Sequence, residues 1–253
     1  MKNNQIKKSF VFFTLLILLT AFIHPGYAST GFKFPLKRYV YPESNKNGIS
    51  ITLSNNTDIP YLIESWVASA DNKTYLPVNN IPDDKVPFII LPPLKQINAH
   101  TEFSWSIRRT GVIVNGEPLP DDRESLFWIG MKAIPSESKD KNNGVFFKVS
   151  PEFYFKLLYR PKSIEHVRLQ DAEDSLVITR IGNQLSVNNP SPLFITFDQL
   201  LVGTTELKNG DALITIKPFS VRMIDLPESQ KNKVITWRIS DENLFELTTH
   251  TVK

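Results

Sequence analysis

The chain has 253 residues, which is enough for one large or two small domains with proper cores. Its 29 Lys and Arg exceed its 26 Asp and Glu by three, and Lys2, Lys7 and Lys8 account for that excess. The remaining charge is balanced and predicts no nucleic-acid binding as a property of the whole protein. The absence of cysteine excludes disulfides, thiol catalysis and cysteine-ligated metals.

The first 28 residues have the pattern of a secretory signal peptide. A basic start precedes an apolar run at 10–23, and residues 26–28 place small side chains where a signal peptidase requires them. The run of 14 residues is short for a bilayer span, although an uncleaved anchor is the alternative. We predict cleavage after Ala28, which leaves a mature chain of 225 residues.

The rest of the chain has the pattern of an all-β protein. Apolar and polar residues alternate at 48–55, 103–108 and 125–134, and residues 61–67 form a further strand-like segment, with Pro and Asn/Asp clusters between these segments. Eighteen prolines and the lack of a sustained 3.6-residue period argue against long helices. Short strands with frequent turns are typical of β-sandwiches or barrels. No internal repeat is apparent in the sequence.

The segment from Val145 to Tyr159 is strand-like over 15 residues, far longer than the usual strand of about 5–6 residues. Pro161 follows it and provides a natural boundary. We therefore predict two domains, 29–160 and 161–253. In the second domain, strand patterns recur at 175–178, 184–187, 193–201, 212–223 and 234–239.

No sequence motif indicates catalysis. Three histidines of the predicted mature chain, His100, His166 and His250, lie far apart in the sequence. The acidic cluster at 121–124 could supply a carboxylate pair, but it follows two prolines and precedes an apolar strand, which favours a charged turn. We expect no enzymatic activity, no metal and no cofactor.

Six segments together identify a family. They are PYLIESW at 60–66, PFIILPPL at 87–94, LPDDRESLFW at 119–128, KLLYRP at 156–161, NPSPL at 189–193 and KPFS at 217–220. In this order they resemble the signature segments of the PapD-like periplasmic pilus chaperones. The resemblance implies two immunoglobulin-like β-sandwich domains in an L-shaped or boomerang arrangement.

The resemblance also implies a function in the periplasm. Such a chaperone binds pilin subunits by donor-strand complementation, lending a strand to a subunit sandwich that lacks one, and delivers them to an outer-membrane usher. The lent residues would be Val145, Phe147 and Val149. Pro151 departs from the family pattern and removes one backbone donor from this strand. An exposed apolar edge makes a dimer of the free chaperone plausible.

Two sets of charged residues have roles by the same resemblance. Arg38 and Lys156 would anchor the C-terminal carboxylate of the subunit. Glu124, Arg160 and Asp241 would form a salt-bridge network that fixes the two domains relative to each other.

Two other functions remain open on the sequence. Immunoglobulin-like sandwiches host many activities, so a secreted adhesion or binding module is one alternative. A secreted hydrolase with a dispersed site is the other, and it would require His100 or His166 to lie near Asp121 or Asp122.

Overall fold

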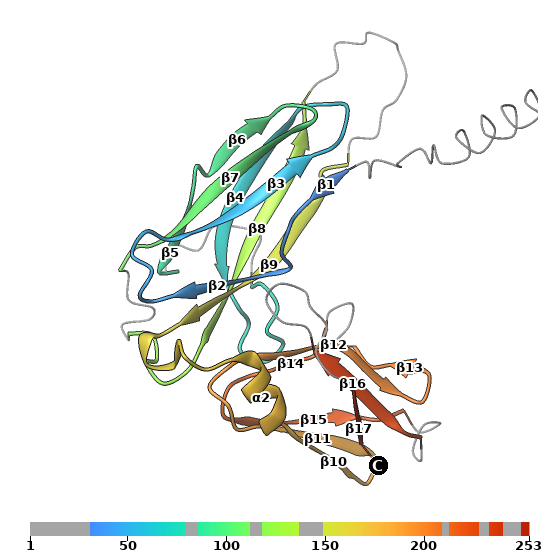
Figure 1. Ribbon diagram of the computed structural model, residues 1–253. Helices are drawn as coiled ribbons and strands as arrows, with labels where there is room; N and C mark the ends of the chain where they lie inside the picture. Colours follow the sequence, from blue (N-terminus) through green and yellow to red (C-terminus); the bar gives the residue numbers. More distant parts are fainter. Residues whose placement is uncertain are drawn as a thin grey trace, which may run out of the picture. The chain divides into compact units, whose positions relative to one another are not determined.

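The computed structural model describes residues 31–78, 86–111, 118–136, 149–208, 213–227, 233–239 and 249–252 (Figure 1). Strands dominate these ranges, which confirms the all-β prediction. Within them, no helix is long and apolar enough to cross a membrane.

The first sandwich consists of two sheets that face each other across one core. One sheet has the order β1 (Phe32–Lys33), β3 (Ile49–Asn55), β7 (Thr101–Arg109) and β5 (Phe88–Leu91). The other has the order β2 (Arg38–Pro42), β9 (Glu152–Arg160), β8 (Ser125–Pro135), β4 (Tyr61–Ser69) and β6 (Leu94–Ile97). The pairing of β2 with β9 is parallel, and the other pairs are antiparallel (Figure 1).

The alternation read from the sequence sets the inward faces of this sandwich. Ile51 and Leu53 of β3 and Trp105 and Ile107 of β7 are fully buried, and the residues between them are not. Because successive side chains of a strand point to opposite faces, the period of two places these four in the core. Ile63, Ile129, Met131 and Leu157 are among the fully buried residues that the second sheet contributes to this core.

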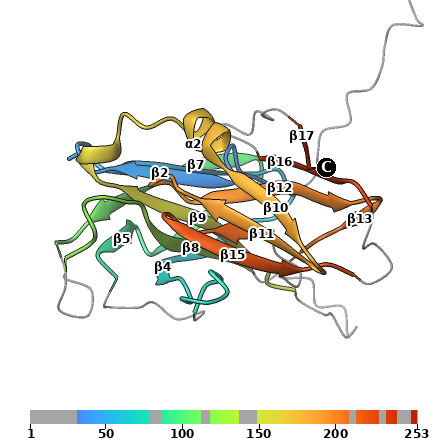
Figure 2. The ribbon, with the colours of Figure 1, turned by 90° about the horizontal axis from the view of Figure 1, so that it is seen from below.

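The second sandwich has its own core. One sheet contains β10 (Val177–Ile181), β11 (Gln184–Asn189) and β15 (Ser220–Asp225), which lie side by side in Figure 2. The other contains β13 (Thr205–Glu206), β12 (Ile195–Val202), β16 (Ile235–Ile239) and β17 (His250–Val252), with β14 (Thr215–Ile216) also paired to β12. A 3₁₀ turn (Lys162–Ile164) and the short helix α2 (Leu169–Ser175) precede these strands.

A buried asparagine closes the same kind of turn in each sandwich. Asn55 and Asn189 are fully buried, and each donates its side-chain amide to two backbone carbonyls. Each amide oxygen accepts bonds from the residue two positions on, Thr57 or Ser191. Buried polar groups need hydrogen-bond partners, and in both sandwiches the turn supplies them to the asparagine. The same buried asparagine turn therefore occurs twice, although the sequence shows no repeat.

The predicted long strand is shorter in the described residues. β9 spans Glu152–Arg160, and residues 149–151 precede it outside any strand, so the prediction of strand over 149–151 is wrong. Pro151 has no N–H to donate, although its carbonyl accepts a bond of 2.9 Å from the Ala133 N–H. Residues 145–148, with Val145 and Phe147, lie outside the described residues.

The change from one core to the other occurs close to Pro161. The first core includes Tyr159, and the second begins with Ile164. These positions support the predicted boundary, which together with the L-shaped arrangement stays a prediction.

Candidate functional site

Two cations lie side by side on one face of the β2–β9 sheet. Arg38 and Lys156 are direct register partners in the parallel pair. Their neighbours Tyr39, Phe155 and Leu157 are buried in the core of the first sandwich. The period of two therefore directs Arg38 and Lys156 to the opposite face, away from that core. The sequence thus brings two positive charges together where no core packing requires them.

Two hydroxyl groups of the second sandwich surround the end of Lys156. Its Nζ lies 2.7 Å from Thr196 Oγ1 and 2.6 Å from Thr215 Oγ1. These threonines are register partners on β12 and β14, and their hydroxyl oxygens are 3.2 Å apart. The ring of Trp128, on β8, lies 5.9 Å from Nζ. Lys156 as a whole residue is partly exposed, and its amine lies among these two hydroxyls and the indole ring.

This environment disfavours a positive charge on Lys156. Burial lowers the pKa of Lys156 from its ordinary 10.5 to about 7, and the charge of Arg38 adds to the shift. In the part of the chain that the structure describes, no carboxylate forms an ion pair with Lys156. Two cations and two hydroxyls are groups that bind an anion, and a carboxylate here would offset the cost of desolvation.

A buried ion pair lies nearby on β8 and β9. The side chain of Glu124, fully buried just before β8, accepts bonds from Arg160 Nε at 2.9 Å and Nη2 at 2.7 Å. Its other oxygen accepts a bond of 2.8 Å from the Phe194 N–H, and its own N–H donates to the Pro192 carbonyl at 2.9 Å. Glu124 therefore connects the first sandwich to the segment that leads into β12. Asp241, the third predicted member, lies outside the described residues.

The acidic cluster at 121–124 does not form a catalytic pair. Asp122 binds Arg123 in an exposed ion pair of 2.7 Å, as expected for a charged turn. His100 pairs with Asp58 at 3.0 Å, not with Asp121 or Asp122. Among the described residues, no group of three His, Cys, Asp or Glu side chains could hold a metal.

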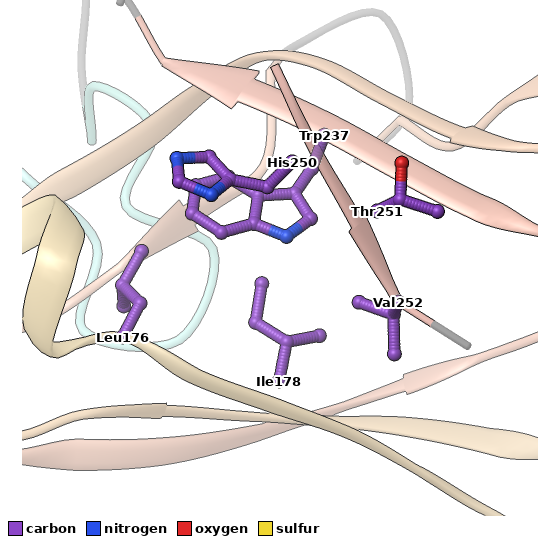
Figure 3. Close-up of a pocket in the computed structure, with 6 residues that line it drawn as sticks. All are labelled: Leu176, Ile178, Trp237, His250, Thr251 and Val252. Carbon is purple, nitrogen blue, oxygen red and sulfur yellow. The ribbon is translucent and has the colours of Figure 1, made fainter. Parts of the chain in front are cut away.

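A pocket of about 340 Å³ lies in the second sandwich, and none of the residues that line it belongs to the charged pairs described above (Figure 3). His250 stacks on Trp237 with ring centroids 4.1 Å apart, and its Nε2 lies 3.1 Å from Glu173 Oε1. Burial raises the pKa of Glu173, while the contact with His250 opposes that shift. Leu176 and Ile178 line the other side of the pocket.

Sequence reasoning missed the groups that enclose Lys156. Thr196 and Thr215 are separated from it by 40 and 59 positions, and neither lies in a charged or catalytic motif. The alternation at 193–201 indicated a strand, but gave no sign that one of its hydroxyls contacts β9. Trp128 does fall within the segment 119–128, but nothing in that segment indicates a contact with Lys156.

Family models match both sandwiches. The model for the N-terminal domain of PapD, a pili and flagellar-assembly chaperone, matches residues 32–165. The model for the C-terminal domain of the pili assembly chaperone PapD matches residues 171–242. The chain belongs to the PapD family of pili assembly chaperones. The family match confirms the resemblance read from the six segments, and with it the two immunoglobulin-like domains and the function in pilus assembly.

Individual relatives agree with this assignment over most of the chain. The probable fimbrial chaperone protein ElfD of Escherichia coli K12 is 35% identical over 202 residues, covering 79% of this chain and 77% of its own. The chaperone protein FimC of the same strain is 30% identical over 244 residues, with 95% and 93% covered. The crystal structure of the E. coli chaperone DraB superposes with a TM-score of 0.67 at 29% identity, covering 89% of this chain and all of DraB.

Proposed function

We propose that this PapD-family chaperone acts in the periplasm, where it binds the C-terminal carboxylate of a pilin subunit with Arg38 and Lys156 and lends a strand to the subunit. One observation carries the proposal. Two adjacent cations face away from the core, and among the described residues Lys156 donates to two neutral hydroxyls. A carboxylate bound here would accept charge-assisted hydrogen bonds from Lys156 and from Arg38 beside it, and such bonds are the strong ones.

The lent strand is the segment that leads into β9. Val149 lies in this segment and is 75% exposed, which is unusual for a valine beside a sandwich core. Strand addition of this kind is the established mode of chaperone–pilin complexes, in which main-chain bonds give affinity and alternate side chains fill pockets. We assign Val145 and Phe147 to the same face by the period of two. The fixed position of Lys156 in β9 sets the register of this strand against the subunit.

Export and delivery complete the proposal. The basic start, apolar run and small residues at 26–28 support secretion with cleavage after Ala28. A pilus chaperone in the periplasm passes its subunit to an outer-membrane usher. The chain has no assigned catalytic role, and Glu124, Arg160 and Asp241 serve to fix the two domains.

The test is recovery of pilin subunits from the periplasm of cells that express the chaperone. We expect the wild type to copurify with a subunit, and the variants Arg38→Ala and Lys156→Ala to lose it while remaining folded. Lys132→Ala is the matched control, since Lys132 is a lysine on neighbouring β8 whose partner is Glu152 at 3.2 Å. Normal recovery with both anchor variants would contradict the carboxylate site. A folded wild type that binds no subunit would favour the secreted adhesion module instead.

A further inference from the structure

The two threonines around Lys156 can serve either protonation state of its amine. An ammonium group has three donors and needs acceptors, whereas a neutral amine has two donors and one lone pair. Each threonine hydroxyl can donate or accept, and either of the two can be the donor in their 3.2 Å contact. Rotation of hydroxyl hydrogens lets the two threonines accept two N–H bonds from the ammonium, or accept one bond from the neutral amine and donate one to it, without movement of heavy atoms.

The charged groups around this position favour the neutral amine in the free protein. Arg38 lies beside Lys156 on β2, and Arg222 on β15 donates to the Thr215 carbonyl at 2.7 Å. The acidic residue on β12, Asp198, already binds Arg238 at 3.1 Å. Trp128 packs from β8 and carries no charge. Arg38 and Arg222 are thus cations around this position. The carboxylates of Asp198 and of Glu124 each bind an arginine and not Lys156.

We propose that the free chaperone holds Lys156 partly as a neutral amine at neutral pH and largely so at alkaline pH, between Thr196 and Thr215, and that this amine takes up a proton when the subunit carboxylate binds. This proton uptake depends on the carboxylate capture proposed above. The balance is one proton from solvent, added to the lone pair of Nζ, for each carboxylate bound. The product is an ammonium–carboxylate pair beside Arg38, in which the incoming negative charge stabilises the ammonium of Lys156. The lowered pKa of Lys156, about 7, agrees with this geometry.

Proton uptake makes subunit affinity depend on pH. Below the pKa of free Lys156 the site is already charged, so affinity is constant. Above it, each binding event must take a proton from solvent, and the dissociation constant rises by up to tenfold per pH unit. We therefore expect a rise of about tenfold between pH 6 and pH 8, with a pKa near 7 for the free site. Subunits are held most tightly at neutral and mildly acidic pH.

The first arm of the test follows Lys156 directly in the free, full-length mature chaperone. Lysine labelled with ¹³C at Cε is titrated by NMR from pH 5 to pH 10, and the signal is assigned as the one missing in Lys156→Arg. We expect this signal to titrate near neutral pH. A Lys156 signal that titrates above pH 9 would overturn the proposal, whatever the binding data show.

The second arm measures affinity for the subunit recovered by copurification, at pH 6, 7 and 8. The wild type should lose about tenfold in affinity over this range. Lys156→Arg, whose side chain keeps its charge at all these values, should show no such loss. A wild-type affinity that is constant from pH 6 to pH 8 would overturn the proposal. If Lys156 titrates near neutral pH but no subunit binds at any pH, the carboxylate function itself is overturned.

Discussion

The ion pair of Glu124 and Arg160 gives the sharpest prediction on stability. The side chain of Glu124 has no exposed surface and that of Arg160 is only 12% exposed, so neither charge can be hydrated in place. Arg160→Met keeps much of the volume of the side chain but removes the positive charge next to the buried carboxylate.

The structure sets the size of this effect. Removal of one partner from a buried ion pair costs about 3–5 kcal/mol in free energy of unfolding, because the other charge stays desolvated. Glu124→Gln combined with Arg160→Met should cost less than Arg160→Met alone, since the Glu124 carboxylate then no longer stays buried without its arginine. The Phe194 N–H, 2.8 Å from Glu124 Oε2, can still donate to a glutamine oxygen in that double variant.

Urea denaturation followed by tryptophan fluorescence and by circular dichroism measures these differences. Arg168→Met is the control, because the Arg168–Asp171 pair is exposed and should contribute only about 0–1 kcal/mol. A cost for Arg160→Met no larger than that of the control would refute the reasoning. A double variant less stable than Arg160→Met alone would refute it as well.

Three further predictions concern single positions. Lys156→Met should stabilise the free chaperone, because the folded-state pKa of Lys156, about 7, lies below its ordinary 10.5. The charged lysine opposes folding most below pH 7, by at most roughly 5 kcal/mol, and this penalty disappears as the pH rises towards 10.5. The stability advantage of the variant should therefore shrink by roughly 2–3 kcal/mol between denaturation at pH 6 and at pH 9. An advantage that does not change with pH would argue against the lowered pKa of Lys156. Gly130→Ala should lower the melting temperature by a measurable amount, corresponding to about 1–3 kcal/mol, because an added Cβ would overlap the Trp66 ring, and an unchanged thermal melt would contradict this. His250→Ala should cost about 1.5–3 kcal/mol in denaturation at pH 6, since it removes a hydrogen-bond partner from buried Glu173, and wild-type stability would show that the contact does not matter.

Much of the fold could be predicted because the core faces follow the period of two. The buried apolar residues of β3 and β7, Ile51, Leu53, Trp105 and Ile107, belong to the alternating segments 48–55 and 103–108. The single strand predicted at 212–223 is instead two, β14 and β15, in the described residues. Between them Phe219 takes a positive φ of 49°, and a phenylalanine gives no sign of such a turn in the sequence.

The candidate site could be predicted only in part, for a physical reason. Lys156, Glu124 and Arg160 lie in segments that resemble family motifs, whereas Arg38 precedes all six of them. The structure pairs Arg38 with Lys156 in register and Glu124 with Arg160 in an ion pair. The groups that surround the Lys156 amine are hydroxyls on strands that lie far from it in the sequence. Threonine is common on strands for packing reasons alone, so these residues do not stand out. Local pattern therefore identifies the charges of the site but not the surroundings that set their pKa.

The central claim is capture of a subunit carboxylate by Arg38 and Lys156, and one calorimetric measurement tests it most directly. A peptide with the sequence of the last strand of the copurified subunit is titrated into the chaperone at pH 6, once with a free C-terminal carboxylate and once as the amide. The account predicts that the free acid binds at least tenfold more tightly, and that Arg38→Ala removes most of this difference, because hydrogen bonds between charged groups contribute about 1.5–3 kcal/mol each. Equal affinity of the acid and the amide for the wild-type chaperone would contradict the account.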